Sequence, residues 1–269
     1  MEKGTKYPII LIHGVIIKEF KFFRAFGRIE KVLTSNGYKV YTAPIDGVGT
    51  IENNVHQLEK FICEVLKKEN TNKVNLIAHS KGGLDSKFFI ENLNNNDVVA
   101  TLTTLCTPFK GSPIASFILR FPNWMIKIIA WWIDLIYKMF ADKNPDSLKV
   151  CNELKLVDDL NDECLKISKD IYVQSYSTIM ERSRDDFVMG IPLAFSKYFS
   201  DNKTDGLVPI ESTFIGEYKG LAINKSTSHT EIIDFMVKKK KREKIHNFYL
   251  ILVSDRKYPK DCVNNYQTP

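Results

Sequence analysis

The hydrophobic and polar positions of the chain follow two alternating patterns. Short aliphatic runs are typical of strands buried in a parallel sheet, and apolar residues every three to four positions are typical of helices. Strands are predicted at residues 7–12, 38–43, 74–78, 98–106 and 169–177. Helices are predicted at residues 20–33, 54–68, 84–92, 148–167 and 232–253. This order predicts right-handed βαβ crossovers, and therefore an α/β fold with a mostly parallel central sheet and helices on both faces.

One segment, residues 113–142, interrupts the alternation. It is unusually apolar and contains all three tryptophans of the chain, Trp124, Trp131 and Trp132. Its longest apolar run, 128–133, has six residues, whereas a transmembrane helix needs about 20, so no membrane-spanning segment is predicted. The position of the segment favours a helical cap, or lid, that can meet lipid; one or two core helices are the alternative. Residues 180–200 are interpreted as a second piece of the cap.

The composition fits one domain, residues 1–269, with a large core, since 44% of the residues are hydrophobic and the chain shows no internal repeats. The net charge of +6 is spread over 38 basic and 32 acidic residues, which does not indicate nucleic-acid binding. The basic run from Lys238 to Arg242 is interpreted as the solvated face of the last helix. A membrane-surface or nucleic-acid patch is the alternative.

Two features bear on the cellular location. The first residues contain no apolar leader segment. The five cysteines show no C-x-x-C spacing, and their odd number means that they cannot all form disulfides within the chain; both features are typical of reduced thiols. A cytoplasmic location is therefore favoured, and secretion with removal of a leader is the alternative.

Candidate chemistry begins at Ser80, where the strand at 74–78 turns abruptly into the next helix. A serine at the apex of such a turn is the geometry of a nucleophile elbow. The crowded turn needs small residues two positions before and two after the serine, and Ala78 and Gly82 meet this requirement. The helix N-terminus also favours developing negative charge. Ser80 is therefore the predicted nucleophile.

A serine nucleophile needs a histidine base, which in turn needs a carboxylate to orient it. In a strand–elbow–helix fold these partners follow the serine, the acid before the histidine. Of the five histidines, His229 fits by position, just before the last predicted helix. Asp205, in an Asp-Gly-Leu-Val-Pro turn, is the predicted acid. Its rivals are Asp201, Asp185 and Asp186.

The oxyanion formed by attack on a carbonyl needs preorganised N–H donors. One predicted donor is the backbone N–H of Lys81, directly after the nucleophile. The other is the backbone N–H of Val15, which follows the flexible Gly14 at the end of the first strand.

Together these motifs resemble those of the bacterial triacylglycerol lipases and esterases of the α/β-hydrolase fold. The similarity rests on residues 7–14, 74–85, 107–112, 205–209 and 228–231. The resemblance implies Ser80 as nucleophile, Asp205 as acid and His229 as base, with the Val15 and Lys81 amides as the oxyanion hole. No cofactor is expected for the chemistry. Many such lipases hold a structural calcium partly through an acidic residue two positions after the histidine, which makes Glu231 a candidate ligand.

The expected activity is that of a serine carboxylic-ester hydrolase, a lipase that cleaves acylglycerols or other hydrophobic esters through an acyl-enzyme on Ser80. The expected partners are a hydrophobic ester and, through the cap, a lipid interface. A short-chain carboxylesterase, a thioesterase or an acyltransferase with the same triad is the alternative. A non-enzymatic membrane-surface protein is a third reading.

Overall fold

The computed structural model describes residues 4–16, 24–93, 97–156, 167, 171–186, 188–199 and 203–255. Within them lies one sheet of six strands in the order β2-β1-β3-β4-β5-β6, and all neighbouring pairs are parallel. The strands are β1 (Ile9–Ile12), β2 (Val40–Thr42), β3 (Val74–His79), β4 (Val99–Leu105), β5 (Tyr172–Ser177) and β6 (Glu217–Leu221). The described α-helices are α1 (Ile29–Ser35), α2 (Ile51–Glu69), α3 (Lys81–Asn92), α4 (Pro113–Ile118), α5 (Asn123–Met139), α6 (Ser147–Glu153), α7 (Gly190–Phe199) and α8 (Lys239–Ser254).

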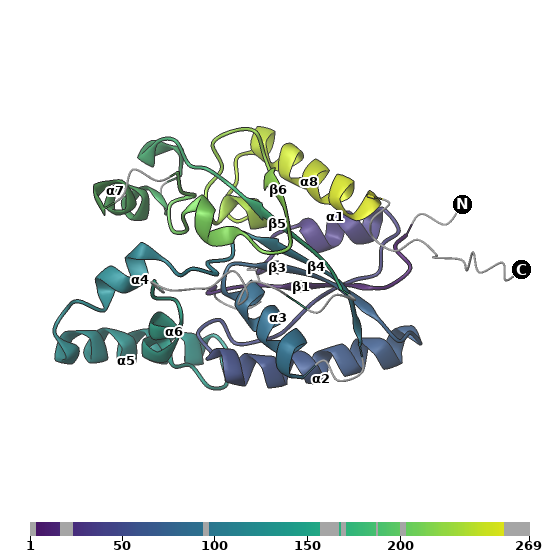
Figure 1. The fold of residues 1–269 in the computed structure, drawn as a ribbon, viewed down its shortest axis with the longest axis horizontal. Helices are drawn as coiled ribbons and strands as arrows, with labels where there is room; N and C mark the ends of the chain where they lie inside the picture. Colours follow the sequence, from purple (N-terminus) through teal and green to yellow (C-terminus); the bar gives the residue numbers. More distant parts are fainter. Residues whose placement is uncertain are drawn as a thin grey trace, which may run out of the picture.

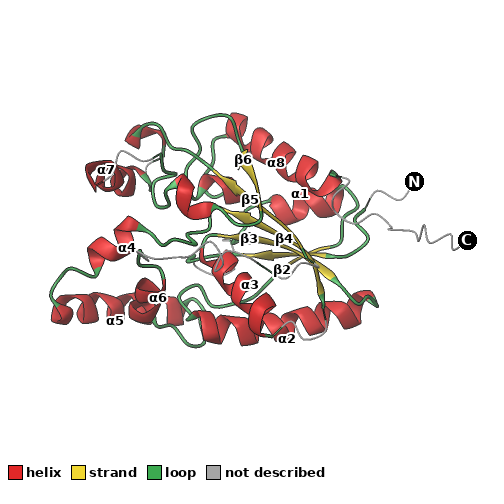
Figure 2. Ribbon diagram, viewed as in Figure 1, coloured by secondary structure: helices red, strands yellow, loops and turns green. Residues whose placement is uncertain are grey.

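Helices cover both faces of the sheet (Figures 1 and 2). Along β1, Ile9 and Leu11 belong to the core shared with α1 and α8, whereas Ile10 and Ile12 belong to the core shared with α2 and α3. Successive side chains of a strand point to opposite faces, so a strand buried on both faces needs apolar residues at every position. The aliphatic run in the sequence has this origin, and the predicted α/β fold is confirmed.

Helices α4, α5, α6 and α7 lie together at the left end of the molecule in Figure 1. Of the α5 residues, Ile126 and Ala130 are buried, while Trp124, Trp131 and Trp132 are 65%, 58% and 55% exposed. The alternative of a core helix is therefore wrong, because a core helix would bury its large apolar side chains. Among the described helices, none is both long enough and apolar enough to cross a membrane. The single-domain boundaries and the role of the segment as a cap stay predictions.

Two carboxylates fasten the end of α5 to the loop between β2 and α2. The Asp142 side chain accepts hydrogen bonds from the backbone N–H groups of residues 47 and 48, at 3.1 and 2.9 Å. Asp46 does the reverse and accepts from the N–H groups of Lys143 and Asn144, each at 3.0 Å. Both carboxylates are buried, with Asp46 0% and Asp142 4% exposed, so this double contact fixes one end of the segment on the core.

Both the first and the last predicted helix are shorter in the structure. Helix α1 begins at Ile29 because Gly27 adopts a left-handed conformation, with φ of +48°; residues 17–23 lie outside the described part. The predicted helix at 232–253 is interrupted by Asp234, also left-handed (φ 59°), and α8 begins only at Lys239. The buried Asp234 carboxylate accepts from the Arg28 N–H and pairs with Arg242, contacts that an unbroken helix would not place.

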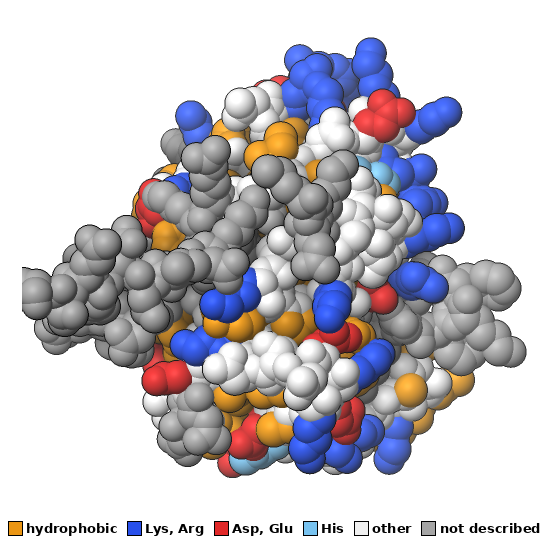
Figure 3. Space-filling model, turned by 90° about the vertical axis from the view of Figure 1, so that its right-hand side faces the viewer, with side chains coloured by type: hydrophobic (Ala, Val, Ile, Leu, Met, Phe, Trp, Pro, Cys, Tyr) orange, Lys and Arg blue, Asp and Glu red, His pale blue; other side chains and the backbone are white. Residues whose placement is uncertain are grey.

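Three other expectations change. Strand β6 was not predicted, because its side chains are exposed or half-buried and carry little apolar pattern. The helix predicted at 148–167 is present as α6, which ends at Glu153; residues 157–166 are outside the described part. The basic run at 238–242 is not solely a solvated face, since Lys241 and Arg242 pair with buried carboxylates. Figure 3 shows blue Lys and Arg groups interspersed with acidic ones over the visible face opposite α4 and α5.

Candidate active site

Ser80 lies at the apex of a sharp turn between β3 and α3. Its backbone has φ of 54° and ψ of −130°, a conformation that costs a non-glycine residue free energy and that is concentrated at functional sites. The Ser80 N–H donates to the Leu105 carbonyl of the neighbouring strand at 3.0 Å, which holds the turn in place. The nucleophile elbow expected from the sequence is the local geometry observed.

The turn needs small residues because other backbone segments press against it. A Cβ at Gly82 would lie 2.5 Å from the His13 carbonyl oxygen, and a Cβ at Gly14 would lie 2.6 Å from the Ser80 Cβ. Both distances are shorter than any side chain tolerates. The loop after β1 is therefore packed directly on the elbow, with the Gly14 backbone beside the Lys81 amide nitrogen. Val15, the next residue, is 43% exposed.

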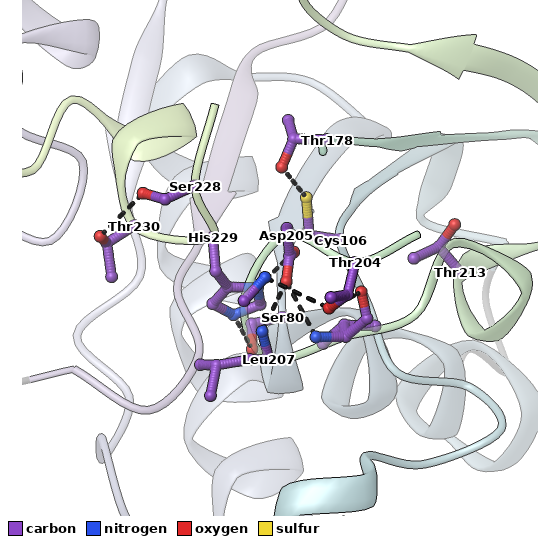
Figure 4. Close-up of polar contacts among 12 residues, drawn as sticks. Ser80, Cys106, Thr178, Thr204, Asp205, Leu207, Thr213, Ser228, His229 and Thr230 are labelled. Carbon is purple, nitrogen blue, oxygen red and sulfur yellow. Dashed lines mark hydrogen bonds and ion pairs between the residues drawn. The ribbon is translucent and has the colours of Figure 1, made fainter. Parts of the chain in front are cut away.

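A continuous chain of hydrogen bonds joins Ser80 to His229 and Asp205 (Figure 4). The His229 Nε2 atom lies 2.8 Å from Ser80 Oγ, and His229 Nδ1 lies 2.7 Å from Asp205 Oδ2. All three residues are buried or nearly so. The structure thus brings together residues that are 24 and 149 positions apart in the sequence. In this arrangement the carboxylate fixes the ring so that one nitrogen faces the hydroxyl.

The Asp205 carboxylate is itself held by backbone donors. Its Oδ1 atom accepts from the N–H groups of Leu207 and Val208, at 2.9 and 2.8 Å. The backbone carbonyl of Asp205 accepts from the His229 N–H at 2.9 Å. The turn thus orients the side chain and the histidine loop at once. Asp205 lies in the loop that follows α7, because α7 and the preceding loop are inserted after β5.

His79, the residue before Ser80, contacts the loop that carries His229. Its Nε2 lies 2.9 Å from the His229 carbonyl oxygen, and the two rings are 4.6 Å apart, tilted by 49°. Burial, with the neighbouring His229 as a smaller cause, lowers the pKa of His79 well below its usual range. The ring is therefore neutral, and its Nε2–H donates to the carbonyl. His79 cannot be the base, because it precedes Ser80 in the sequence. Its position at the end of β3, beside the site, could have indicated the contact with the His229 carbonyl.

The rival acids have other partners. Asp185 accepts from the Ser226 hydroxyl at 2.6 Å, and Asp186 accepts from the hydroxyls of Ser228 and Thr230. These serines and threonine flank His229, so both carboxylates tie the histidine loop to the segment before α7 rather than contacting the ring. Asp201 lies outside the described residues.

The Lys81 side chain turns away from the Ser80 hydroxyl into the core. Its Nζ is 2.7 Å from Asp85 Oδ1, one helical turn along α3, and both side chains are 1% exposed. Asp85 also accepts from Asn54 Nδ2 of α2 at 3.0 Å. Burial raises the pKa of Asp85, while the Lys81 ammonium acts in the opposite direction. The ammonium is thus paired within α3, and Asp85 joins α3 to α2 through Asn54. This arrangement leaves the Lys81 backbone as the part facing the site.

The carboxylate of Glu231 does not fit a calcium site. Its Oε2 accepts from the Ser228 N–H at 3.0 Å and from Lys241 Nζ at 2.6 Å. The Lys241 ammonium thus occupies the place beside the Glu231 carboxylate that a calcium ion would need. Among the described residues, one group combines metal-donor atoms, namely Cys106, Asp205 and His229. Both ring nitrogens of His229 are already engaged, so this group does not fit a resident metal either.

Cys106 lies beside Asp205 and His229, and no pattern in the sequence predicted this position. It follows β4 with φ of 52°, is buried, and its Sγ lies within 4.8 Å of the donor atoms of Asp205 and His229. Thr178, directly after β5, approaches the sulfur from the other side, with its Oγ1 3.3 Å away. Cys106 comes directly after β4, which neighbours β3, and Thr178 comes directly after β5, which neighbours β4. The carboxyl ends of parallel strands meet at one edge of the sheet. That rule was the available signal.

The chain is similar in sequence to proteins that are named triacylglycerol lipases. Triacylglycerol lipase 2 of Saccharomyces cerevisiae is 29% identical over 224 residues, which are 77% of this chain and 61% of the yeast protein. A triacylglycerol lipase of Pseudarthrobacter phenanthrenivorans is 36% identical over 122 residues, which are 43% of this chain and 37% of that protein. The chain therefore spans less than two thirds of the length of either relative. No protein-family model matches the chain.

The solved structure of Staphylococcus hyicus lipase superposes with a TM-score of 0.66 over 92% of this chain and 94% of that one, at 14% identity. A likeness at this identity establishes the fold. The chain has the α/β-hydrolase fold, and the two relatives described above carry names of triacylglycerol lipases. The resemblance drawn from the sequence motifs is thereby confirmed.

Proposed function

We propose that the protein is a serine hydrolase that cleaves carboxylic esters of hydrophobic acyl groups, with Ser80 as nucleophile, His229 as base and Asp205 as the orienting acid. The observation that carries the proposal is the chain of two short hydrogen bonds from Ser80 Oγ through the His229 ring to Asp205. Lipase relatives of the same fold support this class of reaction.

In the acylation step, Ser80 Oγ attacks the ester carbonyl carbon while His229 Nε2 accepts the hydroxyl proton. Asp205 stabilises the imidazolium that forms. The backbone N–H of Lys81, at the start of α3, and that of Val15 would stabilise the oxyanion; the close approach of Gly14 to Ser80 supports this assignment. Collapse of the tetrahedral intermediate breaks the C–O bond, and the imidazolium gives its proton to the leaving alcohol.

In the second step, water takes the place of the alcohol. His229 removes a proton from the water as it attacks the acyl-enzyme carbonyl, and the same donors stabilise the second oxyanion. Ser80 leaves with the proton returned by the imidazolium, and a carboxylic acid is released. The reaction needs no cofactor, since the proton acceptor, the nucleophile and the oxyanion donors all belong to the chain.

The exposed face of α5 supports a hydrophobic substrate and contact with a lipid interface. Trp124, Trp131 and Trp132 are more than half exposed, and Lys127 and Lys138 lie on the same helix. Large aromatic side chains with cationic neighbours suit a helix that lies in the interfacial plane of a membrane or lipid droplet. We include in the proposal that α4 and α5 act as the cap of this site.

The test is hydrolysis of p-nitrophenyl butyrate, p-nitrophenyl palmitate and an emulsified triacylglycerol by the purified protein. The expected result is cleavage of all three esters, together with labelling of Ser80 by a fluorophosphonate, mapped by mass spectrometry. Cleavage of butyrate alone would favour the short-chain esterase. Absence of both labelling and ester cleavage would reject the proposed function.

The interfacial role of α5 is tested by the double substitution Trp131→Ser/Trp132→Ser. We expect a loss of about tenfold or more on emulsified triacylglycerol, because burying roughly 100 Å² of each indole at the interface is worth more than the roughly 1.4 kcal/mol that a tenfold change represents. Hydrolysis of dissolved p-nitrophenyl butyrate should change less than about threefold. Ile251→Ser, which removes an apolar side chain that is 69% exposed on α8, is the matched control. Equal losses in both variants, or on both substrates, would contradict the role.

A further inference from the structure

The buried thiol of Cys106 lies beside the reacting groups without being one of them. Its Sγ, an oxygen of the Asp205 carboxylate and a nitrogen of the His229 ring all lie within 4.8 Å of one another. Figure 4 shows Cys106 between Asp205 and Thr178. The residue is 1% exposed, so its polar contacts are made inside the protein.

The thiol has a defined direction. Thr178 approaches the sulfur with its hydroxyl, 3.3 Å away, and with its backbone N–H. A sulfur that accepts from Thr178 has its own S–H left to donate, and a carboxylate oxygen of Asp205 lies within 4.8 Å of it. Burial, with the Asp205 charge as a further cause, raises the pKa of the Cys106 thiol well above its usual value. The S–H is therefore kept as a donor over the range in which enzymes are assayed.

We propose that Cys106 is a positioning residue for Asp205: its thiol, oriented by Thr178, donates a hydrogen bond to the carboxylate and limits how strongly that carboxylate stabilises the His229 imidazolium. The proposal rests on the proposed function of the Ser80 site and adds to it. The carboxylate then has four donors, which are the N–H groups of residues 207 and 208, His229 Nδ1–H and the thiol.

The chemistry sets the sign of the effect. Each donor spreads part of the carboxylate charge, so removing one concentrates that charge on the remaining partners. The His229 imidazolium is then stabilised more strongly, and the neutral ring that acts as base is reached only at higher pH. A hydroxyl at the same position is again a donor and restores the original balance. If the thiol served only for packing, replacing it by a methyl group or by a hydroxyl would not change the pH at which His229 becomes neutral in opposite ways.

The test is the pH profile of kcat/KM for p-nitrophenyl butyrate in Cys106→Ala and Cys106→Ser. We expect Cys106→Ala to move the acid limb upward by about half a pH unit, and Cys106→Ser to return it to the wild-type position or below. The other titratable groups near the site stay unchanged: His79 on β3, His13 after β1, and Asp186 and Glu231, which bind Ser228 of the histidine loop.

Cys151→Ala is the matched control, because it removes a half-buried thiol that donates to the Ala115 carbonyl at 3.6 Å, and it should leave the limb unmoved. Thr178→Val, which removes the orienting hydroxyl, should move the limb in the same direction as Cys106→Ala but less, and it keeps the test intact where the alanine variant folds poorly. An unmoved limb in Cys106→Ala, or equal shifts in the alanine and serine variants, would overturn the proposal.

An NMR titration of the His229 ring provides a second readout that does not need turnover. The midpoint should follow the same order, alanine above wild type and serine at or below it. Failure of the proposed function would appear as a wild-type protein that cleaves no ester. Failure of the Cys106 role would appear as identical ring titrations in all variants of a protein that does cleave esters.

Discussion

Substitution of Ser80 by alanine is expected to lower kcat/KM for p-nitrophenyl butyrate at least about 10³-fold. The alanine lacks the oxygen that forms the acyl-enzyme, while His229 and the oxyanion donors remain. Only the residual catalysis that those groups provide would be left. The measurement is the initial rate of p-nitrophenolate release, with circular dichroism and thermal unfolding used to show that the variant is folded.

The matched control is Ser86→Ala, on the same helix. Ser86 is buried, and its hydroxyl donates to the Gly82 carbonyl at 2.7 Å, so this substitution removes a serine of α3 that does not face His229. Its activity should stay within about threefold of wild type. If Ser80→Ala kept more than a tenth of the wild-type rate, or if Ser86→Ala lost as much, Ser80 would not be the nucleophile.

The second large effect is expected for Asp205→Asn, about 10³- to 10⁴-fold in kcat. An asparagine side chain keeps the shape of the turn, because its carbonyl oxygen can still accept from the amides of Leu207 and Val208. Its amide cannot stabilise an imidazolium, and it favours the wrong tautomer of His229. The measurement is kcat on p-nitrophenyl butyrate over a range of pH, with thermal unfolding as the check on folding.

The rivals of Asp205 supply the controls. Asp185→Asn and Asp186→Asn should each cost less than about tenfold, because these side chains bind hydroxyls of the histidine loop and not the ring. Asp201→Asn should stay within about threefold. A loss in any of the three that equals the loss in Asp205→Asn would assign the acid differently and would contradict the geometry.

Local information carried the prediction of the fold a long way. Whether a segment becomes a buried strand or an amphipathic helix depends on the spacing of its own apolar residues, so β1, β3, β4 and α2 were predicted correctly. The elbow was also readable, because steric crowding around Ser80 acts through neighbours two positions away. The same locality explains the errors. Strand β6 lies at the sheet edge and carries little pattern, and the break at Asp234 is stabilised by Arg28, which is 206 positions away in the sequence, together with Arg242.

The sequence by itself determined the class of fold and predicted Ser80 and His229 as nucleophile and base, since a strand–serine–helix turn and the order of acid and base are properties of the chain. Only the tertiary structure distinguished Asp205 from Asp186, paired Glu231 with Lys241, exposed the tryptophans of α5, and brought Cys106 and Thr178 to the carboxylate. The physical reason is that these contacts join residues that are far apart in the sequence. Hydrogen-bond direction and burial depend on which strand ends become neighbours in the sheet, and no spacing within the chain records that.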